Sequence, residues 1–287
     1  MLWSLVPDAV PSAPANPEEH SKLRAAFRDA GNWLLRLLLS PFVEVGALSK
    51  LLWESAFWGI RPPYRGRLFV EAMEFIGIGS IFIVSLTAVF VGGVLALQLV
   101  DGFRDFGAEN QTGAVIGLAL AREVGPVFAA LMVTSRAGSA MTTELGSMRV
   151  TNQIDALVTM AVNPVQYLVV PRLVAGFVML PVLTMLFNIV GVMGAFFVAV
   201  GLLGLDPGVF LDRLKWLVDW DDVSQGLIKA MVFGVALTLI ACRQGFYAEG
   251  GAAGVGRATN RAVVQSAIAI LMLDYLVTSL VLGQGLF

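Results

Sequence analysis

Two stretches of this chain carry no charged residue over a length that can cross a lipid bilayer. One is Phe75–Val100, and the other is Leu173–Leu205, which has thirty-three residues. About 20 apolar residues suffice for a spanning helix, because each adds about 1.5 Å and the hydrocarbon core is about 30 Å thick. Three further stretches are nearly as apolar, so the sequence predicts five spans: Phe75–Val100, Thr112–Ser135, Leu173–Leu205, Val223–Cys242 and Ala262–Leu286. Leu173–Leu205 is long enough to be one tilted helix kinked at Pro181, or two shorter pieces.

The composition predicts the same class, an all-α integral membrane protein. Hydrophobic residues make up 57% of the 287 residues and charged residues 14%, with a mean hydropathy of +0.79. A soluble domain is less apolar than this. The net charge of −2, without a basic stripe, argues against a nucleic-acid partner. A single cysteine, Cys242, and a single histidine, His20, argue against a metal site built from these side chains.

The chain outside the spans suggests two further regions before the membrane domain, which is expected over residues 69–287. Residues 1–20 contain four prolines and are predicted to be a disordered tail. Residues 21–68 mix leucine and tryptophan with charges such as Arg36 and Glu44, and Pro62-Pro63 break the pattern. This pattern is typical of an amphipathic helix in the membrane interface. The alternative is a first spanning helix that is broken at Pro41.

The distribution of lysine and arginine predicts the orientation. Fourteen of these residues fall in the N-terminal region and in the loops after spans two and four. The opposite side has three, in the company of five aspartates. Cytoplasmic loops carry an excess of lysine and arginine, so the sequence predicts a cytoplasmic N-terminus and a C-terminus outside.

Charged residues inside the spans are the first candidate site. Arg122 and Glu123 lie within span two, Asp274 within span five, and Lys229 near the start of span four. An arginine at the centre of a spanning helix costs about 2.5–3.5 kcal/mol on insertion scales, so such residues are paired or line a pathway. Pro126 cannot donate to the carbonyl of residue 122, which predicts a kink beside the charges.

Helix geometry suggests partners for these charges. Adjacent helical residues point about 100° apart, so Arg122 and Glu123 cannot both face one partner. We expect Arg122 to pair with Asp274, and Glu123 to face a central cavity. The alternatives are a packing bridge without a transport role and, for Lys229, a side chain that extends to the membrane surface.

The polar stretch after span two is the second candidate site. Met141, Leu145 and Met148 form an apolar strip at helical spacing, and the residues around it are Thr142, Thr143, Glu144 and Arg149. A short amphipathic helix of this kind can dock into a groove of a soluble partner. The alternative is a solvated loop.

The glycine-rich motifs of nucleotide-binding sites are missing from the sequence. No lysine stands in a phosphate-binding loop, so any ATP must be bound by another chain. The sequence GGAAGVG at residues 250–256 lacks the setting of a dinucleotide site and predicts a loop. Gly113 and Gly117 form a GxxxG pair that suits close helix packing, including packing at a dimer face.

Three segments resemble the MlaE (YrbE) family, the permease subunits of lipid-transporting ABC systems associated with MCE proteins. They are LAREVGPVFAALMVTSRAGSAMTTELGSMRVTNQIDAL, MAVNPVQYLVVPRLVAG and ATNRAVVQSAIAILMLDYLVTSLV. The resemblance implies an interfacial helix followed by five spans in the bacterial inner membrane. It also implies a homodimer, two cytoplasmic ATPase subunits that bind ATP and Mg²⁺, a periplasmic MCE-domain carrier and, in some systems, a STAS-like subunit. The chain itself would hold no cofactor or metal.

The resemblance assigns roles to both candidate sites. Arg122, Glu123, Lys229 and Asp274 match charged positions near the family's lipid pathway, and Thr142, Thr143, Glu144, Met148 and Arg149 match its ATPase coupling helix. We therefore expect a permease that moves phospholipid and is not itself an enzyme. The alternatives are an ion-coupled secondary transporter with Glu123 and Asp274 as proton relays, and a non-transporting membrane scaffold.

Overall fold

The computed structural model of the protein describes residues 43–62 and 65–284, with side chains through residue 280. The chain divides after Lys50 into two compact units. Of the first unit the structure describes residues 43–50, which are helical. The predicted disordered tail, residues 1–20, lies outside the described residues, as does about half of the predicted interfacial region. The second unit, Leu51–Phe287, contains the membrane spans.

Five helical runs of the second unit are long and apolar enough to cross a membrane, and the described part of the chain contains no β-strand. Each run overlaps one predicted span, so the predicted all-α fold with five spans is confirmed. The runs are Gly66–Arg104, Glu109–Val150, Val165–Leu202, Trp220–Phe246 and Gly251–Leu280. Most are longer than predicted, because the helices continue past the apolar core into charged residues that hydropathy excludes.

The first run is interrupted where it enters the apolar stretch. It consists of α2 (Gly66–Ile76), a 3-10 turn (Ile78–Ser80) and α3 (Ile81–Arg104). At the break, Arg136 Nη1 donates a hydrogen bond to the Phe75 carbonyl. A Cβ atom at Gly79 would lie 2.2 Å from Arg136 Nη1, so a larger residue there would displace the guanidinium from this position.

The second run contains both candidate sites. It begins with a 3-10 turn (Glu109–Gln111) and α4 (Thr112–Ala119), and continues through a π-turn (Leu120–Val124) into α5 (Gly125–Val133). A second π-turn (Thr134–Gly138) leads to α6 (Ser139–Val150). The polar stretch is therefore the end of a long spanning helix. The separate short helix is α7 (Gln153–Thr159), which follows it.

The remaining runs settle two predictions. A π-turn (Val165–Val169), α8 (Val170–Phe196) and a further π-turn (Phe197–Leu202) form one uninterrupted run that contains Pro181, so Leu173–Leu205 is not two pieces. After α9 (Pro207–Leu217) come α10 (Trp220–Phe246) and α11 (Gly251–Gln284). The predicted glycine loop at residues 250–256 is wrong, because α11 begins at Gly251 and includes Gly254 and Gly256.

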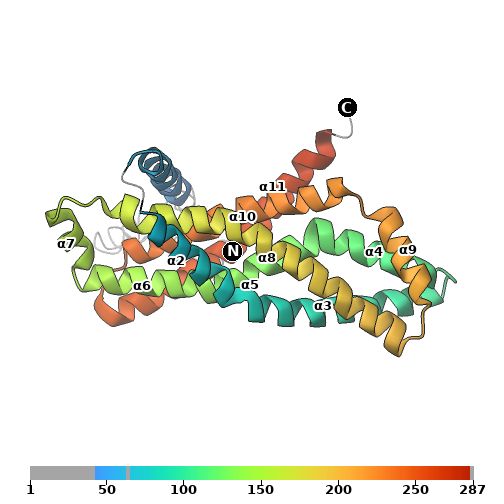
Figure 1. Ribbon diagram of the computed structural model, residues 1–287. Helices are drawn as coiled ribbons and strands as arrows, with labels where there is room; N and C mark the ends of the chain where they lie inside the picture. The colour runs from blue at the N-terminus through green and yellow to red at the C-terminus, as the bar shows by residue number, and fades with distance from the viewer. Residues whose placement is uncertain (1–42, 63–64, 285–287) are drawn as a thin grey trace, which may run out of the picture. The chain divides into compact units, whose positions relative to one another are not determined.

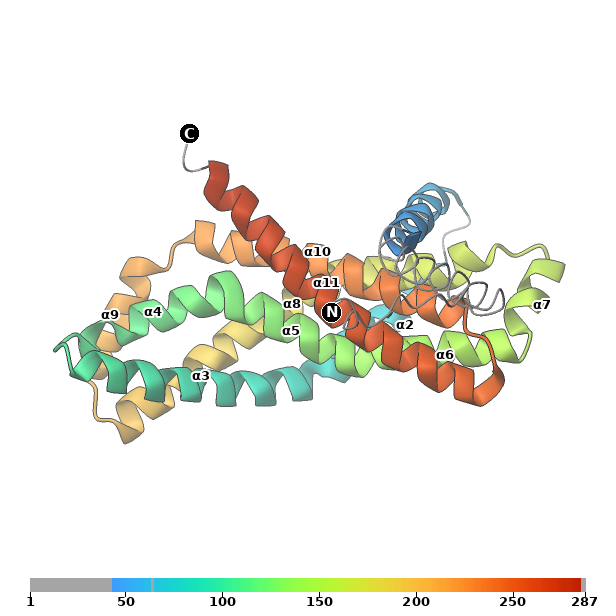
Figure 2. The same cartoon turned by 180° about the vertical axis from the view of Figure 1, so that it is seen from behind.

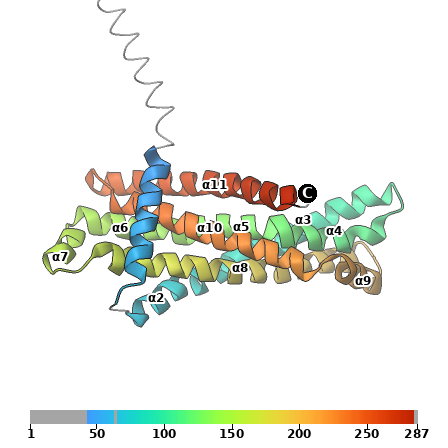
Figure 3. The same cartoon turned by 90° about the horizontal axis from the view of Figure 1, so that it is seen from above.

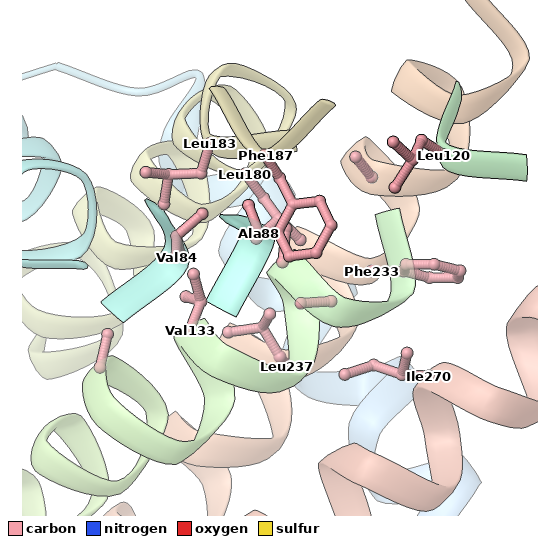
Figure 4. Packing of buried hydrophobic residues seen from close by; sticks show 14 of the residues in the cluster. Val84, Ala88, Leu120, Val133, Leu180, Leu183, Phe187, Phe233, Leu237 and Ile270 are labelled. Atoms are coloured by element: carbon pink, nitrogen blue, oxygen red, sulfur yellow. The ribbon is translucent and has the colours of Figure 1, made fainter. Parts of the chain in front are cut away.

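Helix α8 packs against α2, α3, α5 and α10 (Figures 1 and 2). Glycines allow two of these contacts to be close. A Cβ at Gly92 of α3 would lie 2.0 Å from the Gly191 carbonyl oxygen, and one at Gly234 of α10 would lie 2.2 Å from that of Gly176. Small residues let spanning helices approach in this way. Larger side chains, including Leu180, Phe187, Phe233 and Leu237, fill the core of the helix bundle (Figure 4).

The loops of the second unit gather at two ends (Figure 3). At one end, Gln166 Nε2 donates to the Arg61 carbonyl at 2.7 Å, and Gly146 lies against Ala248. We call this the basic end; it comprises residues 60–62 and 65, α7 with the residues that flank it (151–164), and residues 247–250. The acidic end comprises residues 105–111 and α9 with the residues that flank it (203–219), and there Arg104 Nη2 donates to the Leu203 carbonyl at 2.9 Å. Which end faces the cytoplasm stays a prediction from the charge distribution.

The GxxxG pair is used within the chain. A Cβ at Gly113 would lie 2.5 Å from the Phe210 carbonyl oxygen, and one at Gly117 would lie 2.2 Å from Leu214 Cδ1. Both contacts are with α9, which folds back against α4 at the acidic end. These glycines therefore do not provide a face for a second copy.

Candidate functional site

The first π-turn of the second run places Arg122 and Glu123. Within it, the Gly125 amide donates to the Leu120 carbonyl, five residues back, so the turn holds one residue more than an α-helical turn. Pro126 follows at the start of α5 and has no amide hydrogen to give. A π-turn thus lies beside the charges, while the kink expected from Pro126 stays a prediction. π-turns of this kind are frequent at functional sites.

A single close contact brings α10 against this turn. A Cβ at Gly226 would lie 2.0 Å from the Ala121 carbonyl oxygen and 3.3 Å from Pro126 Cγ. Asp222 precedes Gly226 by four residues, and Lys229 follows it by three, so all three share one face of α10. The contact at Gly226 therefore places an acid beside Arg122 and a base beside Glu123.

Lys229 is the centre of the larger charge cluster. Its Nζ lies 2.5 Å from Glu123 Oε2 and 3.0 Å from Asp274 Oδ1, and only 4% of its side chain is exposed. Thr278 Oγ1 donates to Glu123 Oε1 at 3.4 Å. The contact with Asp274 is an ion pair without hydrogen-bond geometry, which leaves Asp274 Oδ1 without a hydrogen-bond donor among the described residues. The cluster joins spans two, four and five.

Arg122 has a different partner, at the start of α10. Its Nη2 and Nε lie 2.5 Å and 2.6 Å from Asp222 Oδ1. Asp222 Oδ2 accepts from the Asp219 amide at 3.0 Å, as part of the capping box that begins α10. The Asp222 side chain is 5% exposed and that of Arg122 is 40% exposed. The pair therefore ties span two to the first turn of span four.

The predicted pairing of Arg122 with Asp274 is wrong. Asp274 belongs to Lys229, and Arg122 to Asp222, a residue that the sequence analysis left among the acidic loop residues. Lys229 does not extend to the surface, because it is buried between two carboxylates. The spacing of Asp222, Gly226 and Lys229 on one helix face is the signal that could have identified the pairs, but only with knowledge of which helix packs against the π-turn.

The charges of the Lys229 cluster are not balanced. Glu123 and Asp274 are two carboxylates with one lysine between them, and the Glu123 side chain is 43% exposed while that of Asp274 is 22% exposed. The exposed part of Glu123 leaves acceptor capacity toward whatever lies beside the spans. The described residues contain no group of three or more His, Cys, Asp or Glu that could hold a metal ion.

The polar stretch on α6 is placed differently from the prediction. Met141 and Leu145 are fully buried, because α6 packs against α10 and α11. Thr142 is also fully buried and donates to the Ala241 carbonyl at 3.1 Å. Met141, Leu145 and Thr142 thus face the protein's own bundle. Docking of this stretch onto a soluble partner stays a prediction for its accessible residues.

The other residues of this stretch remain accessible. Thr143 is exposed and shares a hydrogen bond of 2.9 Å with Thr259. Glu144 pairs with Arg172 at 2.8 Å, and Arg149 pairs with Asp155 of α7 at 2.7 Å. Met148 is half-buried. Beyond them α7 carries exposed apolar side chains at its end, Val158 and Met160, which are 58% and 63% exposed. α7 and the end of α6 therefore form an accessible surface at the basic end.

Comparison with known proteins identifies relatives over most of the chain. The profile of the family described as Permease MlaE matches residues 69–280. A "Probable ABC transporter permease protein" of Rickettsia felis is 42% identical over 237 residues, covering 83% of this chain and 92% of the relative.

Two further relatives have more specific names. The "Intermembrane phospholipid transport system permease protein MlaE" of Haemophilus influenzae is 39% identical over 219 residues, which is 76% of this chain and 84% of the relative. The chloroplast "Protein TRIGALACTOSYLDIACYLGLYCEROL 1" of Arabidopsis thaliana is 31% identical over 264 residues, covering 92% of this chain and 73% of that protein. The region that the family profile matches, residues 69–280, includes the π-turn, Lys229 and Asp274.

Proposed function

Because the chain belongs to the MlaE permease family, we propose that it is the membrane subunit of an ATP-driven transporter that moves phospholipid. The carrier at the acidic end would be a periplasmic MCE-domain protein. The Haemophilus relative is named as a phospholipid transport permease, and the Rickettsia relative as an ABC transporter permease. The protein is an inner-membrane permease with five spans, and hydrolysis of ATP with Mg²⁺ takes place on a separate ATPase.

The observation that carries this proposal is the buried Lys229 between Glu123 and Asp274. Ionisable residues at membrane depth are costly and mark substrate pathways. Glu123 and Arg122 are each about 40% exposed on the side of the spans. A phospholipid headgroup passing beside the π-turn would therefore meet a carboxylate and a guanidinium that are already held in place. In this proposal Arg122, Glu123, Lys229 and Asp274 line the lipid pathway.

A second copy of the chain completes the proposed pathway. In the fifth run only 11% of the residues of the apolar stretch are buried, against 61% in α10. A helix that carries Asp274 and has so little contact within its own chain suits a position beside a cavity shared by two copies. The proposed assembly is thus a homodimer with two ATPase subunits, and in some systems a STAS-like subunit.

The basic end is the proposed docking surface for the ATPase. Thr143, Glu144, Met148 and Arg149 lie there, and α7 adds the exposed Val158 and Met160. An apolar tip surrounded by charged residues fits a groove on a soluble subunit. Motion of the ATPase would reach the Lys229 cluster through α6 and α5, which continue into the π-turn without a loop.

The test is transfer of labelled phospholipid in proteoliposomes that contain the protein with its co-purifying partners. We expect transfer to require ATP and to fall at least tenfold in Glu123→Gln at normal expression. Glu109→Gln is the matched control, because Glu109 makes the same kind of ion pair at the acidic start of the same run. Full transfer by Glu123→Gln would remove Glu123 from the pathway.

An ion-coupled transporter is the second candidate, because one lysine faces two carboxylates. Where two carboxylates share one cation, one of them can carry a proton that it takes up and releases. This candidate predicts transport driven by a pH gradient alone, with no ATPase among the co-purifying proteins. Transfer that needs ATP and is unaffected by the gradient excludes it.

A further inference from the structure

Arg61 and Arg65 lie at the basic end, shortly before α2, and no carboxylate of the described residues neutralises them. Within the described residues, neither guanidinium has an Asp or Glu oxygen within 4.0 Å. Each lies instead over an aromatic ring: Arg61 Cζ is 4.0 Å from the centroid of Phe57, and Arg65 Cζ is 4.9 Å from that of Tyr167. Cation–π contacts restrain a side chain without cancelling its charge. Two restrained cations are thus available to an anion.

Both arginines line a cavity of about 120 Å³. Its walls also include Trp58, Asn163, Gln166 and Tyr167. Gln166 Nε2 donates to the Arg61 carbonyl at 2.7 Å, and Asn163 Oδ1 accepts from the Val165 amide at 2.9 Å. The first bond fastens the backbone that carries Arg61 to the start of the third run, and the second closes the turn at that start. The α2 helix begins at the same cavity without a side-chain cap, so its first amide groups add positive potential.

An apolar groove of about 290 Å³ adjoins this cavity, since Gly59, Phe69 and Val170 line both. The groove lies between the helix of residues 51–59 and α8. Its other walls are almost entirely apolar: Leu52, Ala56, Leu173, Val174, Phe177 and Val235. The exception is Ser55, whose residue is 4% exposed and whose Oγ has no hydrogen-bond partner among the described residues.

The order of these features along the surface is that of a phospholipid. We propose that this site, formed by Arg61, Arg65, Ser55 and the apolar groove, binds a glycerophospholipid with an anionic headgroup. The phosphate lies between the two arginines, an ester oxygen accepts from Ser55, and an acyl chain occupies the groove. A soluble phosphate compound would leave the groove and the Ser55 hydroxyl unused. The site shares no residue with the Lys229 cluster, so it holds a lipid apart from the transport pathway.

The charge of the site predicts which lipid it prefers. Two arginines without carboxylate partners favour a headgroup with net negative charge over a zwitterionic one. Each basic residue near a membrane surface adds about 1 kcal/mol of attraction for anionic lipid. Loss of both should therefore weaken binding about 30-fold, at 1.4 kcal/mol for each factor of ten.

The test is native mass spectrometry of the full chain in detergent, titrated with phosphatidylglycerol and with phosphatidylcholine of the same acyl chains. We expect the wild type to retain phosphatidylglycerol preferentially, and the double variant Arg61→Gln/Arg65→Gln to lose that preference with the 30-fold weakening above. Arg67→Gln is the matched control: it removes the same charge two residues away, from a side chain that pairs with Glu71 at 2.7 Å and lines neither cavity. Equal binding of both lipids by the wild type, or equal loss in the control, overturns the proposal.

A second pair of variants tests the groove separately. Val174→Trp fills it, whereas Val178→Trp adds the same bulk to an exposed position one turn further along α8 that does not line it. We expect only Val174→Trp to weaken binding of phosphatidylglycerol. Inorganic phosphate should not compete with the lipid. If phosphate displaces the lipid, or if the two tryptophan variants bind alike, the groove holds no acyl chain and the site is not a phospholipid site. This comparison stands even if the arginine variants fail to fold.

Discussion

The Lys229 cluster and the basic end of α6 are both polar regions on the same helical run, but their ion pairs are held in opposite ways. Lys229 is 4% exposed and touches two carboxylates from two other spans. At the basic end, the Arg149–Asp155 pair is 39% and 58% exposed. A buried charge that loses its partner is left without solvation, whereas an exposed one is solvated by water. The same chemistry should therefore contribute to stability in the membrane interior and to partner recognition at the end.

The largest loss of stability is expected from a substitution at Gly226, because its contact with the π-turn holds the buried ion pairs in place. In Gly226→Ala the new Cβ would lie 2.0 Å from a backbone oxygen that cannot rotate away. Helices α10 and α5 must then separate, and we expect a loss of several kcal/mol, as for other overpacked cores. Thermal unfolding in detergent measures this. Gly256→Ala is the control, since nothing lies within 4 Å of its Cβ position and alanine favours a helix. A small effect at Gly226 would mean that the close contact does not hold the cluster together.

The next effect is expected from removing the central cation. Lys229→Met leaves Glu123 and Asp274 as two like charges near each other, which should cost about 3–5 kcal/mol, as for other broken buried pairs. Adding Glu123→Gln and Asp274→Asn should restore part of the stability, because the uncompensated charges are then gone. Unfolding temperatures of the single and triple variants measure the recovery. A triple variant less stable than Lys229→Met would show that the cluster stabilises through packing and not through charge.

A smaller effect is expected at Arg122, whose side chain is 40% exposed. A double-mutant cycle between Arg122→Gln and Asp222→Asn should give a coupling energy of about 1–2 kcal/mol, less than for a fully buried pair. The matched cycle between Arg122→Gln and Asp274→Asn should give a coupling near zero. Coupling with Asp274 that equals or exceeds that with Asp222 would contradict the assignment of the two pairs.

The smallest effect on stability is expected at the basic end. Glu144→Lys together with Arg149→Glu disrupts two pairs whose carboxylates are 52% and 58% exposed. Arg172, the partner of Glu144, is 15% exposed but keeps its hydrogen bond to the Leu168 carbonyl, so unfolding should change by about 1 kcal/mol. ATP-dependent lipid transfer should nevertheless fall strongly, because both side chains lie on the proposed ATPase surface. Normal assembly and transfer by the Glu144/Arg149 variant would place the ATPase contact elsewhere, with α7 as the next surface to test.

The sequence by itself determined the class, the number of spans and the positions of the charges inside them. These follow from local quantities: the length of an apolar run, the residues that interrupt it, and the thickness of a bilayer. Whether Leu173–Leu205 is one helix or two did not follow in this way, because its length and Pro181 allow both, and only the structure shows one uninterrupted run. The family resemblance rested on three contiguous sequence segments and needed no tertiary information.

Only the tertiary structure decided which charges meet and which face of α6 is free. Asp222 and Asp274 lie 100 and 152 residues from Arg122 in the chain, and hydropathy treats the two acids alike. Their assignment depends on the helix that can approach the π-turn, and Gly226 lets α10 come within contact of Ala121. The apolar strip at Met141 and Leu145 was visible as a pattern, but a helical stripe has the same period whether it faces a partner or its own bundle. The packing shows that this stripe faces the protein's own bundle, because α10 and α11 cover it and leave α7 exposed.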